Sequence, residues 1–196
     1  MSKLRVLFLC TGNACRSQMA EGWARHLKRH AIEAYSAGIE THGLNPRAVQ
    51  VMAEAGVDIS GHRSKQVGEF KDIAFDYVVT VCGHAHENCP FFAGNAKKIH
   101  VGFDDPPTLA RDAKTEEEAL AHYRRVRDEI RTFVEQLPAA LQQPATPHSV
   151  KRQRSHEQIP QPSRRVAGRR KRRQGDGALA QALDGLPLEK GDARGI

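Results

Sequence analysis

The sequence contains no apolar run that is long enough to cross a membrane. A membrane-spanning helix needs about 20 consecutive apolar residues, and no window of the chain approaches that length. The apolar start "LRVLFLC" is too short, and is followed too soon by polar residues, to be a secretory signal peptide. We therefore expect a cytoplasmic protein that makes no contact with membranes.

Residues 1–143 lack a net charge, because their 18 Lys and Arg balance their 18 Asp and Glu. Residues 144–196 carry 12 basic and 5 acidic side chains, which accounts for the net charge of +7. Nucleic-acid binding needs concentrated positive charge, so only this last part, with its run "RRVAGRRKRRQG", is a candidate for it. Because the run has no interleaved aromatic residues, we expect a solvated tail instead.

The last part of the chain also lacks apolar periodicity. Its stretch "QQPATPHSVKRQRSHEQIPQPSRRVAGRRKRRQGDG" is rich in Pro, Gln and Arg. Such a composition cannot bury enough apolar surface to offset the entropy lost on ordering. We predict a folded domain over residues 1–141 and a basic, disordered extension over residues 142–196.

Cysteine is scarce, and the four cysteines are Cys10, Cys15, Cys82 and Cys89. In a reducing compartment, this usage indicates thiol chemistry or metal binding rather than structural disulfides. The spacing of Cys82 and Cys89, with a His-x-His between them, does not match common zinc sites. We expect no metal, and we expect His84 and His86 to be solvated or to tune the neighbouring thiols.

The sequence does contain an alternation of apolar runs and amphipathic stretches. The runs predict strands near residues 6–10, 32–38, 75–82 and 97–103, and the amphipathic stretches predict helices over residues 17–30, 46–55 and 116–137. The alternation predicts an α/β fold, with a small four-stranded parallel sheet and helices on both faces, as in flavodoxin-like proteins. The carboxyl ends of parallel strands share one edge, where ligands bind, so Cys10, Cys82 and the "DDPP" after Phe103 should meet there.

The segment "CTGNACRS" joins the first predicted strand to the first predicted helix. A loop in this place can turn its N–H groups inward and hold a tetrahedral oxyanion, and the Arg16 guanidinium adds a planar fork of donors. These groups would lower the pKa of Cys10 from ~8.5 to roughly 3.5–7.5 and make it a nucleophile. The predicted oxyanion site comprises Thr11, Gly12, Asn13, Ala14, Cys15, Arg16 and Ser17.

Three segments resemble one known family. "CTGNACRSQMAEGW" resembles the active-site loop of the low-molecular-weight protein tyrosine phosphatases, and with "DYVVTVCGHAHENCP" and "VGFDDPP" it is similar to the thioredoxin-coupled arsenate reductases built on that fold. The resemblance covers roughly residues 3–137. It implies the fold of these phosphatases, no tightly bound cofactor and reduced thioredoxin as electron donor. It also implies arsenate as substrate, with phosphate or sulfate as competing oxyanions.

The resemblance further implies a relay of three thiols. Cys10 attacks arsenate, and Asp105 protonates the departing oxygen. Cys82 then attacks the adduct on Cys10 and releases arsenite, after which Cys89 attacks Cys82 and forms the disulfide that thioredoxin reduces. Neighbouring parallel strands run ~4.8 Å apart, which suits a bond between Cys10 and Cys82. Seven residues of helix would hold Cys82 and Cys89 ~10 Å apart, so their bond requires the segment to unwind.

Two other functions stay open. A phosphatase needs the oxyanion loop and an acid, which the family pattern places on Asp105 rather than on Asp104, but it leaves Cys82 and Cys89 without a role. Reduction of arsenic(V) takes two electrons, which one dithiol supplies. A non-catalytic binding module would instead act through the basic tail.

Some members of the family bind potassium beside the loop, with groups equivalent to Asn13, Glu21 and Ser36. In this chain the neighbouring segment reads "GHRSKQ" and brings Arg63 and Lys65 where those members have a threonine and an acidic residue. A lysine there supplies its own positive charge. We therefore expect no potassium dependence.

Overall fold

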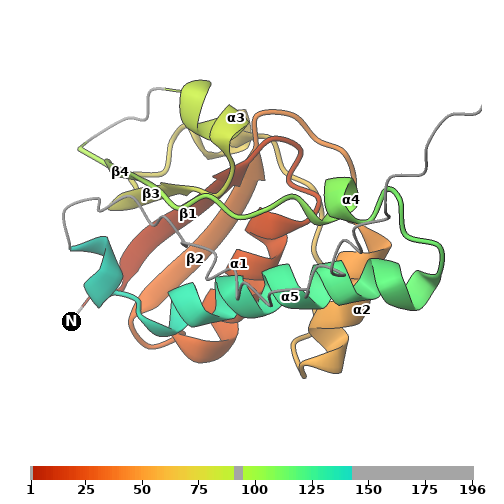
Figure 1. The fold of residues 1–196 in the computed structure, drawn as a ribbon. Coiled ribbons are helices and arrows are strands. Elements are labelled where there is room, and N and C mark those ends of the chain that lie inside the picture. Colours follow the sequence, from red (N-terminus) through yellow and green to blue (C-terminus); the bar gives the residue numbers. More distant parts are fainter. Residues whose placement is uncertain (1, 91–94, 143–196) are drawn as a thin grey trace, which may run out of the picture. The chain divides into compact units, whose positions relative to one another are not determined.

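The structure is a computed structural model that describes residues 2–90 and 95–142 (Figure 1). Apart from its first residue, the predicted extension over residues 142–196 lies outside the described residues, and so does the basic run within it. Among the described residues, no helix is both long and apolar enough to cross a membrane.

The sheet confirms the predicted class, with four parallel strands in the order β2-β1-β3-β4. The strands are β1 (Leu4–Cys10), β2 (Ile32–Gly38), β3 (Tyr77–Thr80) and β4 (Lys97–His100). β3 and β4 are shorter than predicted because their ladder pairs only four residues of each strand. In the central strand β1, residues 6–9 are fully buried, as expected where both faces of a parallel sheet are covered.

Five α-helices and two short 3₁₀-helices complete the described fold. They are α1 (Arg16–Leu27), α2 (Pro46–Glu54), α3 (Gly83–Glu87), α4 (Pro106–Leu109), α5 (Glu116–Glu135), η1 (Val67–Phe70) and η2 (Ala139–Leu141). The start of α2 is fixed by Asn45, whose side chain accepts hydrogen bonds from the backbone N–H groups of Arg47 and Ala48. The side chain of Thr115 caps α5 in the same way.

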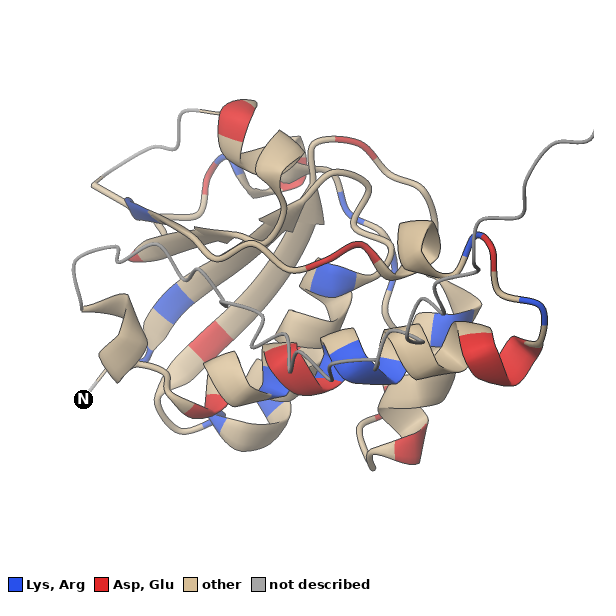
Figure 2. Cartoon of the chain, in the orientation of Figure 1, with Lys and Arg blue, Asp and Glu red and all other residues tan. Residues whose placement is uncertain are grey.

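Both faces of the sheet are covered. Figure 1 shows α1, α2 and α5 on one side of the sheet and α3 on the other. On β2, the ring of Tyr35 meets Phe70 and Phe75 edge to face, at centroid distances of 5.7 and 5.4 Å. Basic and acidic residues alternate along the outer face of α5 (Figure 2), where they pair with each other and with α2. This pairing keeps the described surface from concentrating charge of one sign.

Candidate active site

The loop after β1 is held in shape by residues 39–45. Four of its carbonyl oxygens accept hydrogen bonds of 2.9–3.1 Å from N–H groups of that segment: Cys10 from Ile39, Thr11 from Glu40, Gly12 from His42 and Ala14 from Asn45. In a trans peptide the N–H points away from the C=O of the same unit. The N–H groups that follow these carbonyls are therefore turned toward the inside of the loop, which is the arrangement an oxyanion requires.

Asn13 is the internal support of the loop. Its backbone has a positive φ of 45°, which asparagine tolerates better than most residues. Its buried side chain donates to the hydroxyls of Ser17 and Ser36 at 2.8 and 2.9 Å and accepts from the backbone N–H of Lys65 at 2.8 Å. These contacts tie the loop to α1, to β2 and to the segment at Lys65.

Three further residues support the loop, and the sequence analysis missed them. The side chain of Gln18 donates to Asn13 Oδ1 at 2.8 Å, and the hydroxyl of Ser64 donates to the Asn13 carbonyl at 2.8 Å. A Cβ on Gly38 would lie 2.6 Å from the Thr11 carbonyl oxygen, so only glycine fits there. A polar Gln18 among apolar positions of α1, and a glycine at the end of β2, were the available signals.

The Cys10 thiol lies at the centre of the loop and is only 4% exposed. Its sulfur shares a hydrogen bond of 2.9 Å with the Ser17 hydroxyl and accepts one of 3.2 Å from the Asn13 N–H. Burial nevertheless raises the pKa of this thiol, and the hydrogen bonds from Ser17 and Asn13 oppose the rise without overcoming it. The predicted lowering of the Cys10 pKa is therefore wrong.

Arg16 forms an ion pair with Asp105 instead of with the thiol. One of its terminal nitrogens lies 2.8 Å from Asp105 Oδ1, and the other donates to the Phe103 carbonyl at 3.1 Å. The second Asp105 oxygen accepts hydrogen bonds from the N–H and hydroxyl of Thr108, which makes Asp105 the cap of α4. Asp104 turns away and pairs with Arg125 on α5 at 2.8 Å. The structure thus brings Asp105, and not Asp104, to the loop.

Cys82 lies beside the loop because β1 and β3 are neighbours in the sheet. Leu9 pairs with Thr80, and the Val81 N–H donates to the Leu9 carbonyl at 2.9 Å. The strands β1 and β3 therefore end side by side. The Cys82 sulfur lies 3.4 Å from the Thr11 hydroxyl and 3.4 Å from the Ala85 N–H at the start of α3. All four cysteines are free in the structure.

Cys89 follows α3 and is separated from Cys82 by that helix. Its half-buried sulfur donates to the Pro90 carbonyl at 3.7 Å. Burial raises the pKa of the Cys89 thiol, and the nearby Lys98 ammonium partly opposes the rise. Both cysteines are free, and the chain between them consists of the five residues of α3 and Asn88. The need for this segment to unwind before Cys89 reaches Cys82 stays a prediction.

A family model described as low molecular weight phosphotyrosine protein phosphatase matches residues 5–146 of the chain. The chain belongs to this family. The loop from Cys10 to Ser17 and the acid-bearing segment at Asp105 both lie within the matched residues.

Several proteins that are similar to this chain are named as arsenate reductases. An arsenate reductase of Halalkalibacterium halodurans is 49% identical over 139 residues, which are 69% of this chain and 98% of that protein. A solved arsenate reductase in oxidized state has a TM-score of 0.57 at 32% identity and covers 70% of this chain and 98% of its own. A thioredoxin-dependent arsenate reductase of Corynebacterium glutamicum has a TM-score of 0.53 at 25% identity, over 72% of this chain and 63% of that one.

The Lys65 ammonium group lies against Glu21, one of the residues named in the potassium prediction. Glu21 is only 1% exposed, and its carboxylate accepts from the Ser36 hydroxyl at 2.5 Å and from Lys65 Nζ at 3.1 Å. Arg25 pairs with the other Glu21 oxygen at 2.5 Å. Arg63 lies outside the cluster and pairs with Glu69. Lys65 thus lies where the sequence analysis expected it, and independence from potassium stays a prediction.

Cys15 is also part of the loop after β1, but its thiol has a different environment from that of Cys10. The side chain is buried, and burial strongly raises the pKa of the thiol against the opposing charge of Arg16. A thiol that stays protonated is a poor nucleophile. Cys15 contributes its backbone to the loop, in keeping with its predicted place in the oxyanion site.

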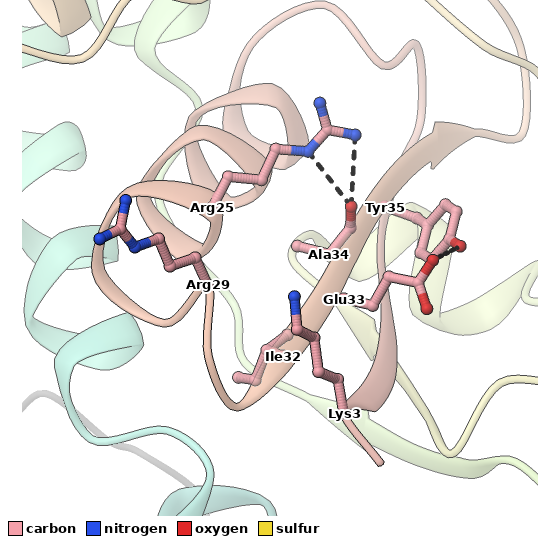
Figure 3. A pocket seen from close by; sticks show the side chains of 7 residues that line it. All are labelled: Lys3, Arg25, Arg29, Ile32, Glu33, Ala34 and Tyr35. Atoms are coloured by element: carbon pink, nitrogen blue, oxygen red, sulfur yellow. Dashed lines mark hydrogen bonds between the residues drawn. The ribbon is translucent and has the colours of Figure 1, made fainter.

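Outside the family loop, the described residues offer no second cluster of predicted site residues. A hollow of about 250 Å³ beside β2 is lined by Lys3, Arg25, Arg29, Ile32, Glu33, Ala34 and Tyr35 (Figure 3). None of these residues belongs to the predicted site, and the Arg25 guanidinium bonds to the Ala34 carbonyl. Within residues 2–90 and 95–142, no group of three or more His, Cys, Asp or Glu side chains is placed to hold a metal ion.

Proposed function

We propose that this protein reduces arsenate to arsenite and that reduced thioredoxin restores its thiols. The observation that carries the proposal is the placement of Cys82 at the rim of an oxyanion loop that already holds the Cys10 nucleophile. A hydrolase needs one nucleophile there. A second thiol at the same strand edge, with Cys89 behind it, supplies the electron pair that reduction of arsenic(V) requires.

In the first step the Cys10 sulfur attacks the arsenic atom. The inward N–H groups and Arg16 hold the oxyanion, and the proton of the buried Cys10 thiol passes to an arsenate oxygen. A sulfur–arsenic bond forms, an arsenic–oxygen bond breaks, and Asp105 protonates the departing oxygen so that it leaves as water. The ion pair between Arg16 and Asp105 keeps the two groups on the same side of the loop. When the oxyanion takes over Arg16, Asp105 is released from the pair and takes up from solvent the proton that it gives to the departing oxygen.

In the second step the Cys82 thiolate attacks the Cys10 sulfur. A disulfide bond forms between the two residues, and the sulfur–arsenic pair of electrons goes to arsenic, which leaves as arsenite. Cys89 then attacks Cys82, the new disulfide forms and Cys10 leaves as a thiolate. Thioredoxin reduces the Cys82–Cys89 disulfide by exchange, and its own dithiol supplies the two electrons.

The test is the effect of removing each distal thiol. Cys89→Ser should release about one arsenite per protein and then stop, because Cys10 and Cys82 alone supply two electrons. Cys82→Ser should fail to turn over with thioredoxin. Multiple turnover that survives both changes would exclude the relay, and mass mapping after one turnover should find the linkage between Cys82 and Cys89.

Hydrolysis of phosphate monoesters is the second candidate function, which the family membership favours. It would use Cys10, Arg16 and Asp105 and leave Cys82 idle. Hydrolysis of p-nitrophenyl phosphate that depends on Cys10 but is unchanged in Cys82→Ser, together with no arsenite release, would establish this function instead. Salt-sensitive RNA binding that is lost without residues 142–196, with neither activity present, would establish the third candidate, a binding module.

A further inference from the structure

The rings of His86 and His100 stack on each other. Their centroids are 4.4 Å apart, and the ring planes meet at 29°. His86 lies on α3, between Cys82 and Cys89, and His100 is the last residue of β4. The stack therefore joins the helix between the two distal thiols to the sheet.

His100 is the fixed half of the pair. Its Nδ1 shares a hydrogen bond of 2.9 Å with the hydroxyl of Thr80, a buried residue of β3, and the two residues are register partners in the ladder. The other half belongs to a helix of five residues, which is too short to be stable by itself. The persistence of α3 thus depends on contacts outside the helix, among them the stack of His86 on His100 and the hydrogen bond from the Ala85 N–H to the Cys82 sulfur.

β4 also holds the far end of the same segment. Lys98 Nζ donates to the Pro90 carbonyl at 2.9 Å, directly after Cys89. Lys98 and His100 are two residues apart on the strand and so point to the same face of the sheet. Two side chains on one face of β4 therefore hold the chain on either side of Cys89, at His86 and at Pro90.

We propose that the stacked rings of His86 and His100 form a clasp that stabilises the helical, dithiol form of the Cys82–Cys89 segment and limits how readily Cys89 reaches Cys82. This inference rests on the proposed function. Cys89 attack on Cys82 forms one disulfide and breaks the Cys10–Cys82 disulfide, with Cys10 leaving as a thiolate and no net change in electrons. Because α3 must unwind for that attack, the two rings must separate. His86 and His100 are positioning residues and touch no reacting atom.

The stability of the clasp should depend on pH in a definite direction. Burial lowers the pKa of His100, and the charge of His86 lowers it further, against a hydrogen bond at Thr80. The other titratable residues of these two elements are His84 and Glu87 on α3 and Lys97 and Lys98 on β4. The His100 ring in the stack therefore binds a proton less readily than a separated histidine ring with the ordinary pKa of about 6.5. The stabilisation by the stack is present above that pH and is lost as the pH falls, which favours the disulfide in acid.

The experiment measures the Cys82–Cys89 disulfide in the full chain, equilibrated with defined ratios of reduced to oxidised dithiothreitol at pH 7.5. Free thiols are alkylated, and the linkage is quantified by mass spectrometry. Loss of a ring pair shifts such an equilibrium about two- to tenfold, so His86→Ala should raise the ratio of disulfide to dithiol by that factor. The matched control is His84→Ala, which makes the same exchange on the same helix without removing the stack, and it should match the wild type.

A conservative variant and a second pH complete the test. His86→Phe keeps a ring on His100 but cannot be protonated, so its ratio at pH 7.5 should return close to the wild-type value. Exchange with dithiothreitol conserves thiol protons, so a change of the ratio with pH reports on the clasp. At pH 5.5 the wild-type ratio of disulfide to dithiol should move toward that of His86→Ala. The ratio of His86→Phe should move less, because its phenyl ring cannot be protonated. Equal ratios for His86→Ala and His84→Ala would overturn the clasp alone. Absence of any Cys82–Cys89 linkage in the wild type would overturn the relay on which it rests.

Discussion

The Arg16 guanidinium lies 2.8 Å from the Asp105 carboxylate and links the oxyanion loop to the segment after β4. Arg16 is largely buried, and Asp105 is about one-third exposed, so the carboxyl faces the entrance of the loop. An acid in this place can reach an oxygen that departs from an oxyanion held by Arg16. Asp105 is therefore the first target for substitution.

We expect Asp105→Asn to lower kcat for arsenate reduction by about 100-fold or more, since a general acid contributes roughly 10²- to 10⁴-fold. KM for arsenate should change little, because Arg16 keeps its charge. Steady-state rates with thioredoxin check this. Asp104→Asn is the matched control, because Asp104 pairs with Arg125 on the surface, and its kcat should stay within about twofold of wild type. Equal losses in the two variants would remove Asp105 from the mechanism.

Substitution of Asn13 should separate its backbone role from its side-chain role. Asn13→Ala removes the hydrogen bonds to Ser17, Ser36 and Lys65 and forces alanine to a φ of 45°. We expect a loss of about 3 kcal/mol in the free energy of unfolding, measured with urea. Asn13→Gly loses the same hydrogen bonds without the φ penalty and should be more stable than Asn13→Ala by about 1 kcal/mol. The opposite order would contradict the role of φ.

The reactivity of Cys10 should depend on the Ser17 hydroxyl. Burial raises the pKa of Cys10 while Ser17 lowers it, so Ser17→Ala should raise the pKa further. A hydrogen bond to a charged group is worth about 1.5 kcal/mol or more, and alkylation of Cys10 at pH 7.5 should slow about 10-fold. Peptide mass mapping after timed iodoacetamide treatment measures this rate. Faster alkylation of Cys10 in Ser17→Ala than in the wild type would refute the claim that the Ser17 hydroxyl lowers the Cys10 pKa.

The raised pKa of Cys10 also fixes the sign of one contribution to stability. The folded protein keeps this thiol protonated at a pH where the unfolded chain has begun to ionise it. The contribution is full below the ordinary thiol pKa of about 8.5 and is lost as the pH rises above it. Cys10→Ala should flatten the fall in the free energy of unfolding between pH 8 and pH 10, and an unchanged slope would contradict the raised pKa.

Lys65 should replace the requirement for a potassium ion. The wild-type free energy of unfolding is expected to be equal in potassium chloride and choline chloride of the same ionic strength. Lys65→Met leaves the buried Glu21 carboxylate with Arg25 as its remaining cation, which should cost about 2 kcal/mol and make the stability higher in potassium than in choline. Arg63→Met is the control, because its exposed pair with Glu69 is worth less than about 1 kcal/mol. A potassium effect in the wild type would exclude this replacement.

Local patterns predicted the strands and longer helices well because each depends on its own residues. The run that became β1 is apolar throughout, and the helix over Glu116–Glu135 starts at a capping threonine followed by three glutamates. The ends of β3 and β4 were predicted less well, because the length of a strand depends on where its neighbour stops pairing. The short helix α4 was not predicted at all, since its four residues are held by Asp105 and not by periodicity.

The residues of the site were also readable from the chain, but their electrostatics were not. A thiol, small residues, an arginine and a serine between a strand and a helix identify an oxyanion loop. The lowered pKa predicted for Cys10 is wrong because the sequence does not show how deeply the thiol is buried. The supporting contacts of Gln18, Ser64 and Gly38 likewise join segments that are distant in sequence.

Local sequence patterns are enough to predict the order of strands and helices, the loop that ends β1 and the three thiols that relay chemistry needs. These features follow from periodicity and residue type, which act over a few neighbours in the chain. The folded structure is needed to show that β1 and β3 are adjacent, that Asp105 meets Arg16 and that His86 lies on His100. Those relationships depend on strand order and on the packing of distant segments, because burial and close contact arise only when the chain is folded.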